Sequence, residues 1–191
     1  MVVEVAPRPQ VESTTAREIE DRYGPQMALC YQCKKCTSGC PVADVMDFRP
    51  HQAVQLVRLG ATDRLLKSDA IWTCVGCYLC TTRCPQGVPV ADLMYSLKRQ
   101  AMKRDLPSRR APVPAFLKAF ASSVERNGRN REAEMIGRYF LATDPRAALK
   151  EMPTGLKLFR QGRLPLWGHK SRGRKAMRAI LNKARRLGGT S

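Results

Sequence analysis

The sequence has no long apolar run and very little histidine. None of its 191 residues lies in a stretch near the roughly 18 consecutive apolar residues that a membrane-spanning helix needs. The first residues, MVVEVAPRPQ, also lack the charged start and apolar core of a signal peptide. The chain is therefore expected to be cytoplasmic. The two histidines, His51 and His169, lie outside the cysteine-rich segments, so neither is expected to bind a metal centre.

Acidic residues are scarce and stop altogether after Glu151. The chain carries 34 Lys and Arg against 16 Asp and Glu, which gives a formal net charge of +18. The last 40 residues hold eleven Lys and Arg, in runs such as HKSRGRKAMR and KARR. This composition predicts a cationic surface for an acidic partner subunit or for lipid headgroups. A tail that only keeps the protein soluble is the alternative.

Eight cysteines form two matched runs. CYQCKKCTSGCP, from Cys30 to Pro41, returns 44 residues later as CVGCYLCTTRCP, from Cys74 to Pro85. In a reducing compartment such clusters favour metal or redox chemistry over disulfides. Each run has the spacing C-x2-C-x2-C-x3-C-P, which is typical of [4Fe-4S] clusters, whereas structural zinc usually takes two separated C-x2-C pairs. Paired zinc sites remain the alternative at this stage.

The two runs are expected to exchange one ligand. In the two-cluster version of this motif, the fourth cysteine binds the cluster of the other run. The first cluster is then predicted to take Cys30, Cys33, Cys36 and Cys84, and the second to take Cys74, Cys77, Cys80 and Cys40. Pro41 and Pro85 favour an extended backbone at the preceding cysteine, which directs it away from its own run.

A second repeat follows the cysteines. PVADVM, Pro41–Met46, matches PVADLM, Pro89–Met94, at an offset of 48, so QGVP at 86–89 is most simply an insertion in the second half. Matched halves that exchange ligands predict pseudo-two-fold symmetry, with both clusters near the centre. Such proximity suits electron transfer.

The apolar spacing predicts an all-α fold. The expected domains are a flexible N-terminus (1–13), a two-cluster helical domain (14–106), additional helices (107–151) and a basic C-terminal arm with an amphipathic helix (152–191). Helices are expected over 14–23, 53–60, 63–66, 90–105, 113–126, 132–141, 145–150 and 174–187, and an irregular arm over 152–174. The last helix has an apolar stripe that would dock on a partner or an anionic membrane, or pack on its own domain.

Several residues near the cysteines have two interpretations. Lys34, Lys35 and Arg83 would stabilise negatively charged clusters or would simply be solvated. Trp72 and Tyr78 would pack over a cluster or belong to an ordinary core, and packing is favoured.

The twin motifs and their helical spacer resemble the C-type subunit of heterodisulfide reductase. The resemblance lies in CYQCKKCTSGCPVADV and RPHQAVQLVRLGATDRLLKSDAIWTCVGCYLCTTRCPQGVPVADL, and covers roughly residues 26–105. It implies an α-helical ferredoxin module with two [4Fe-4S] clusters. It also implies a relay that carries electrons between a flavin and iron-sulfur subunit, the A type, and a cysteine-rich, disulfide-active subunit, the B type.

The resemblance places catalysis on another chain. The sequence has no adjacent cysteine pair, no ninth cysteine and no G-x-G-x-x-G loop. The competing functions are the iron-sulfur subunit of a succinate, fumarate or glycolate oxidoreductase and a cluster-bearing nucleic-acid-binding protein. The pI near 10.1 favours the latter, but aromatics are only 6% and no basic-aromatic platform is present.

Overall fold

The computed structural model describes residues 14–106, 112–163 and 171–188. These residues form helices and turns without any strand, so the all-α prediction is confirmed. The chain contacts separate two compact units, residues 1–110 and 111–191. The finer division into four segments stays a prediction, and both the N-terminal segment 1–13 and His169 lie outside the described residues.

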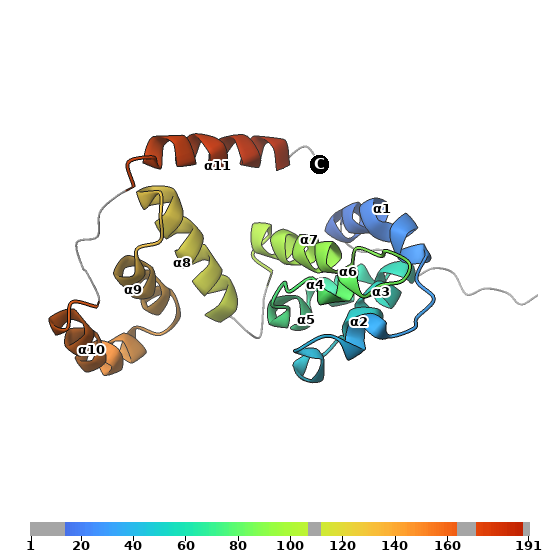
Figure 1. Cartoon of the computed structure of the whole chain (residues 1–191), viewed down its shortest axis with the longest axis horizontal. Coiled ribbons are helices and arrows are strands. Elements are labelled where there is room, and N and C mark those ends of the chain that lie inside the picture. The colour runs from blue at the N-terminus through green and yellow to red at the C-terminus, as the bar shows by residue number, and fades with distance from the viewer. Residues whose placement is uncertain (1–13, 107–111, 164–170, 189–191) are drawn as a thin grey trace, which may run out of the picture. The chain divides into compact units, whose positions relative to one another are not determined.

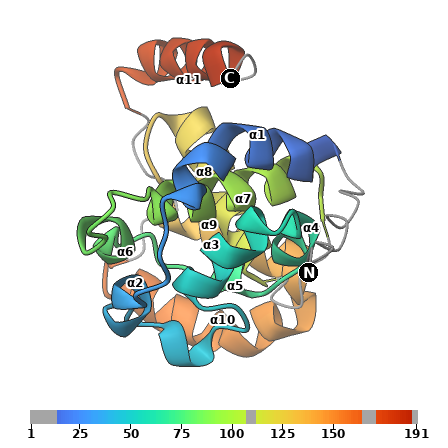
Figure 2. The same cartoon turned by 90° about the vertical axis from the view of Figure 1, so that its right-hand side faces the viewer.

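The first unit surrounds its core with three longer helices and several short ones (Figure 1). Its elements are α1 (Thr14–Ala28), α2 (Lys35–Ser38), the 3-10 turn η1 (Ala43–Val45), α3 (Pro50–Arg58), α4 (Thr62–Leu66), α5 (Ala70–Thr73), α6 (Leu79–Thr82) and α7 (Val90–Lys103). Helix α1 packs on α3, α4 and α7, and α7 also packs on α5 and α6. The short helices α2 and α6 contact each other, and Figure 2 shows them at one edge of the unit.

Helix α7 forms because its apolar residues recur at helical spacing and cover one face. Leu93, Met94, Leu97 and Ala101, the residues predicted for this face, are all at most 2% exposed. Burial of each large apolar side chain contributes about 1.5–3 kcal/mol. Trp72 on α5 is also buried, whereas Tyr78 is 49% exposed. Packing of these two rings over a cluster stays a prediction.

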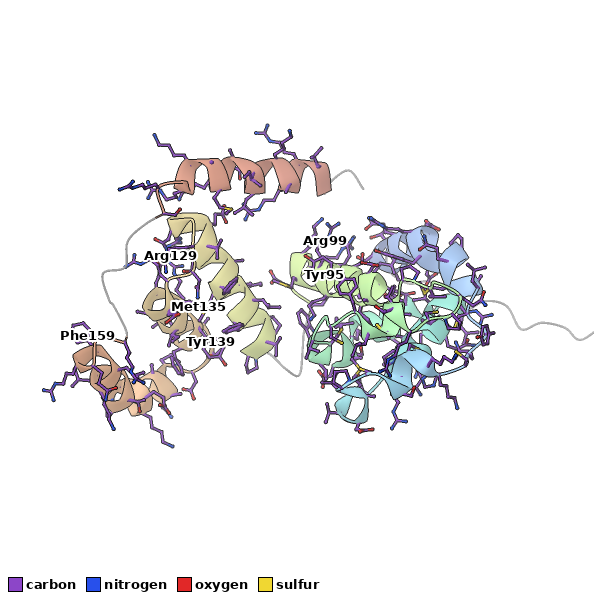
Figure 3. The ribbon with its side chains drawn as sticks, in the orientation of Figure 1. Tyr95, Arg99, Arg129, Met135, Tyr139 and Phe159 are labelled. Atoms are coloured by element: carbon purple, nitrogen blue, oxygen red, sulfur yellow. The ribbon has the colours of Figure 1, made fainter. Side chains whose placement is uncertain are left out.

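The second unit contains α8 (Pro112–Asn127), α9 (Glu132–Thr143), α10 (Pro145–Arg160) and α11 (Arg174–Gly188). Helix α8 packs on α9 and α11, and α9 packs on α10. Phe116 and Tyr139 meet edge to face with ring centroids 6.1 Å apart, and Met135 is buried. Figure 3 shows Met135 and Tyr139 on the side of α9 toward α8.

Helix α10 corrects the prediction of an irregular arm beginning at residue 152. The helix continues to Arg160 although Pro153 and Gly155 lie inside it. Apolar residues at helical spacing continue past the proline, through Leu156 and Phe159. Because α10 has no buried residue, water can satisfy the carbonyl group that loses its hydrogen bond at Pro153. The lost bond therefore costs less than it would in a packed helix.

None of the described helices is both long enough and apolar enough to cross a membrane.

Candidate metal centre

The two cysteine runs fold into loops with the same backbone. In each loop two residues have a positive φ, and they occupy equal positions: Gln32 (60°) matches Gly76 (67°), and Lys34 (64°) matches Tyr78 (62°). Non-glycine residues adopt this left-handed region only occasionally. Left-handed residues in a turn can direct neighbouring backbone N–H groups toward one concavity, which favours an anion. The equal φ values at equal positions show that both loops have the same turn.

Equivalent hydrogen bonds close each loop. Thr37 N donates to the carbonyl oxygen of Lys34 over 2.9 Å, and Thr81 N donates to that of Tyr78 over 3.1 Å. The fourth cysteines follow the same rule, since Cys40 N and Cys84 N donate to the carbonyl oxygens of Thr37 and Thr81 over 3.0 and 3.1 Å. The short helices α2 and α6 thus fix the position of the fourth cysteine in each run.

A threonine joins each loop to the start of a core helix. The hydroxyl oxygen of Thr37 accepts from His51 N over 3.2 Å at the start of α3. The hydroxyl oxygen of Thr81 accepts from Ala91 N over 3.0 Å at the start of α7. Helices α3 and α7 are therefore structural equivalents. This corrects the assignment of QGVP as an insertion: the extra residues lie in the first half, between Cys40 and α3.

Each of these helices also places a cation on the first cysteine of a loop. Arg58 Nη1 on α3 donates to the carbonyl oxygen of Cys30 over 2.9 Å. Lys98 Nζ on α7 donates to the carbonyl oxygen of Cys74 over 2.9 Å. Arg58 is exposed, whereas Lys98 is half-buried, and burial lowers the pKa of Lys98, which the charge of Cys74 opposes. Neither cation was singled out in the sequence, because their roles depend on the repeat between α3 and α7.

The four cysteines predicted for the second cluster line one pocket. Its walls include three cysteines of the second run, Cys74, Cys77 and Cys80, together with Cys40 from the first run. Three cysteines of the second run and one of the first thus line a single pocket, and a [4Fe-4S] cluster takes four cysteine ligands.

Electrostatic coupling indicates which cysteines are neighbours in the other site. Desolvation and then the charges of Cys33, Cys84 and Cys30 raise the pKa of the Tyr31 phenol. Cys84, from the second run, therefore lies near Tyr31 of the first run. The reciprocal pattern holds for Cys40, whose thiol pKa is raised by burial and then by Cys74 and Cys77.

The third cysteine of each run is the most shielded from water. Cys36 and Cys80 occupy equal positions in the two loops, and burial raises the pKa of both thiols, that of Cys80 to about 11. Since only thiolates bind iron, cluster binding must displace these protons.

Hydrogen bonds reach ligand sulfurs in both cysteine runs. Gln32 Nε2 donates to Cys30 Sγ over 3.4 Å and also approaches the carbonyl oxygen of His51 at 3.4 Å. Val88 N donates to Cys84 Sγ over 3.3 Å. Both sulfurs belong to the ligand set predicted for the first cluster. Hydrogen bonds to ligand sulfur favour the reduced cluster.

His51 lies beside the first loop and contacts Thr37, whose hydroxyl is 2.7 Å from His51 Nδ1. Burial, followed by the charges of Lys34 and Arg49, lowers the pKa of His51. The His51 ring thus contacts the hydroxyl group of Thr37.

Comparisons with known proteins bear on the type of cluster. Residues 26–88 match the family described as the 4Fe-4S dicluster domain. The chain is 37% identical over 75 residues to the C-type iron-sulfur subunit of CoB–CoM heterodisulfide reductase from Methanopyrus kandleri, and the match covers 39% of each chain. It is 32% identical over 124 residues to the second such C-type subunit of Methanocaldococcus jannaschii, which covers 64% of this chain and 65% of the relative.

A third relative has a name that adds two further substrates. It is the C-type subunit of the H2:CoB-CoM heterodisulfide,ferredoxin reductase of Methanothermobacter thermautotrophicus, 28% identical over 93 residues, 49% of this chain and 50% of the relative. The chain thus spans about half the length of the curated relatives that it matches. The family match at residues 26–88 contains both cysteine runs. The chain is therefore an all-α protein with a 4Fe-4S dicluster domain for two [4Fe-4S] clusters, and it is similar to the C-type subunit of heterodisulfide reductase.

Proposed function

We propose that the chain is the electron-transfer subunit of a heterodisulfide-reductase-like complex. The observation that carries this proposal is the pair of equivalent loops on the contacting helices α2 and α6. Two clusters held by such loops lie next to each other, which suits successive one-electron transfers. When bound, the clusters supply reversible one-electron oxidation and reduction.

We assign four cysteines to each cluster. The first cluster takes Cys30, Cys33, Cys36 and Cys84, and the second takes Cys74, Cys77, Cys80 and Cys40. The pocket lined by Cys40 and the second run supports the second set. The coupling of Tyr31 to Cys33, Cys84 and Cys30 supports the first.

The other residues of the loops orient these ligands and favour their negative charge. Arg58 and Lys98 hold the carbonyl groups of Cys30 and Cys74. Val88 donates its amide to Cys84 Sγ. A cation and a donor amide both stabilise added negative charge, so these groups favour the reduced state of the clusters.

The partners we propose are an A-type subunit with flavin and iron-sulfur clusters and a B-type cysteine-rich subunit, in the cytoplasm. Two cluster sites use all eight cysteines of the chain, so disulfide chemistry belongs to another subunit. The protein is then a component of an oxidoreductase, and its own role is electron transfer.

Anaerobic purification of the native protein tests this function. We expect about eight irons and eight sulfides per chain, interacting cluster signals in low-temperature electron paramagnetic resonance of the reduced sample, and copurifying flavin and cysteine-rich subunits. Two zinc ions, or metal that cannot be reduced, would contradict the proposal. Copurification with a succinate, fumarate or glycolate oxidoreductase would favour that alternative. Copurifying nucleic acid, released steeply by salt, would favour a nucleic-acid-binding protein.

We further propose that α11 attaches the complex peripherally to an anionic membrane. The helix carries six Lys and Arg and no acidic residue. Arg178 Nε donates to the carbonyl oxygen of Glu125 on α8 over 3.1 Å, and Arg185 pairs with the carboxylate of Glu125 at 2.7 and 2.8 Å. Ile180 and Leu187 nevertheless stay 62% exposed. An exposed apolar stripe beside basic residues is typical of helices that lie in the membrane interface.

Vesicle cosedimentation with the full-length protein tests this attachment. Replacing Ile180 and Leu187 with aspartate should weaken binding to phosphatidylglycerol vesicles at least about tenfold, because two apolar anchors are lost. The matched control is Leu141→Asp/Leu149→Asp, at exposed positions of α9 and α10. Equal binding by all three proteins would contradict the attachment. Binding to an acidic partner subunit, but not to vesicles, would assign α11 to that partner.

A further inference from the structure

The two cysteine loops present different side chains from the same backbone. Tyr31, Lys34 and Lys35 of the first loop occupy the positions that Val75, Tyr78 and Leu79 hold in the second. All six of these residues are exposed. The loop near the first cluster thus offers two lysines where the loop near the second offers a tyrosine and a leucine. Because the backbones of the two loops match, the loops differ here in their exposed side chains and not in the backbone that holds the clusters.

Further cations surround the first loop. Arg58 is exposed and donates to the carbonyl oxygen of Cys30. Arg83 lies across Gly39 at the end of α2, where an added Cβ would come within 2.7 Å of Arg83 Cδ. The absence of a side chain at Gly39 therefore leaves room for the Arg83 side chain. Together with Lys34 and Lys35, these residues place four positive charges around one cluster site.

An exposed apolar patch accompanies these cations. Leu29 and Tyr31, which flank Cys30, are each 58% exposed. The ligand Cys33 in the same loop is also exposed. Exposed apolar side chains with a charged rim are typical of protein interaction sites. A redox partner that docks here reaches the exposed edge of the first cluster.

The second loop has an acidic neighbour instead. Tyr78 OH donates to Asp92 Oδ1 over 3.2 Å. The charge difference between the loops therefore separates the two cluster sites. An acidic partner is attracted to the first loop and discriminated against at the second.

We propose that the Lys34 face, defined as Leu29, Tyr31, Lys34, Lys35, Arg58 and Arg83, docks an acidic redox protein. This rests on the proposed electron-transfer function and deepens it, since it assigns the first cluster as the one that meets an acidic partner. One electron passes between the iron centre of the partner and the first cluster. One centre is oxidised as the other is reduced, and no proton or bond is exchanged.

A double substitution that removes two charges tests the face. The variant Lys34→Gln/Lys35→Gln is compared with Lys67→Gln/Lys103→Gln. The control removes the same charge from two exposed lysines, Lys67 beside α4 and Lys103 at the end of α7. The probe is gallium-substituted plant-type ferredoxin, a small acidic protein that binds without exchanging electrons. Calorimetry with the cluster-loaded protein at low ionic strength should show about tenfold weaker binding for the first pair, and less than about twofold for the control. The salt dependence of binding should also become shallower for the first pair.

The kinetic counterpart uses reduced iron-containing ferredoxin as the electron donor. Electron transfer to the chain should slow in parallel with binding in the Lys34→Gln/Lys35→Gln variant. Photoreduced deazariboflavin, which needs no docking surface, should reduce both variants at equal rates. Iron content and the resonance spectrum of each variant establish that both clusters are present, so failure of this proposal is distinct from failure of the proposed electron-transfer function.

Three results would overturn the docking proposal. Equal weakening of ferredoxin binding in both double variants would show that the effect comes from net charge and not from the Lys34 face. If the unmodified protein does not measurably bind ferredoxin, the proposed acidic partner is contradicted. Single-stranded oligonucleotide binding that is lost only in the Lys34→Gln/Lys35→Gln variant would assign the face to nucleic acid.

Discussion

Replacing Cys84 with alanine should abolish the first cluster, although Cys84 belongs to the second cysteine run. The reason is the proposed exchange of ligands: the charges of Cys84, Cys30 and Cys33 all act on Tyr31, and the Cys84 sulfur accepts a hydrogen bond from Val88 N. A four-iron cluster rarely survives the loss of one of its thiolates. The iron content should fall from about eight to about four per chain.

Resonance spectra identify which cluster is lost. The Cys84→Ala spectrum should match that of Cys30→Ala, a substitution in the first run. The reciprocal variant Cys40→Ala should match Cys77→Ala, because Cys40 lines the pocket of the second run. If Cys84→Ala instead matches Cys77→Ala, each run holds its own cluster and the exchange is wrong. The two reciprocal pairs keep the test decisive even where one variant fails to accumulate.

The proposed exchange would couple the two halves mechanically as well as electronically. Each cluster would hold one cysteine from the other loop, so neither loop could complete its site alone. The contact between α2 and α6 and the position of Arg83 across Gly39 fit this proposal. The two clusters are expected to assemble together and to lie close enough for fast electron transfer between them.

The cysteine spacing predicted the cluster type and the comparisons agree, whereas the loop backbone was not predictable from the residues. Left-handed φ values at Gln32, Lys34 and Tyr78 fall on residues that seldom adopt them. Only Gly76 carries the usual signal for such a turn. The repeat could have revealed its partner Gln32, because a glycine at one of two equal positions indicates the conformation of both.

The second repeat predicted the wrong alignment of the two halves because similar residues form different structures in each half. PVADVM contains the 3-10 turn η1, whereas PVADLM contains the start of α7. The true counterpart of α7 is α3, which begins at Pro50 and shares with α7 the threonine contact and the cation on a cysteine carbonyl. Long-range hydrogen bonds settled this alignment, and no local pattern contains them.

The predicted ends of two helices were also wrong. Helix α1 was expected to end at Tyr23 but continues through Gly24 and Pro25 to Ala28. Helix α10 likewise continues past Pro153. Both extensions include an apolar residue at helical spacing after the proline, namely Met27, which is fully buried, and Leu156, which is exposed. In α1 the packing of Met27 offsets the cost of the proline, and in α10 solvent access limits that cost.

Replacing Lys98 with methionine should lower the reduction potential of the second cluster by about 60 mV, which is tenfold in a one-electron equilibrium. Lys98 Nζ lies 2.9 Å from the carbonyl oxygen of Cys74, inside a half-buried environment where charges are poorly screened. Reduction adds a negative charge to the cluster, so a nearby cation favours the reduced form. Methionine keeps most of the length and the apolar character of the lysine stem but has no charge.

A redox titration followed by electron paramagnetic resonance measures this shift at each cluster. Arg58→Met is the matched variant on the first cluster, and its effect should be smaller because Arg58 is exposed and screened by solvent. Lys103→Met, at the end of α7, is the control for loss of net charge. Equal shifts at both clusters in Lys98→Met, or a shift as large in Lys103→Met, would show that net charge and not the contact with Cys74 sets the potential. A selective shift means that the half-buried cation of α7 and the exposed cation of α3 give the two clusters unequal potentials, which provides a direction for electron flow between loops of equivalent backbone.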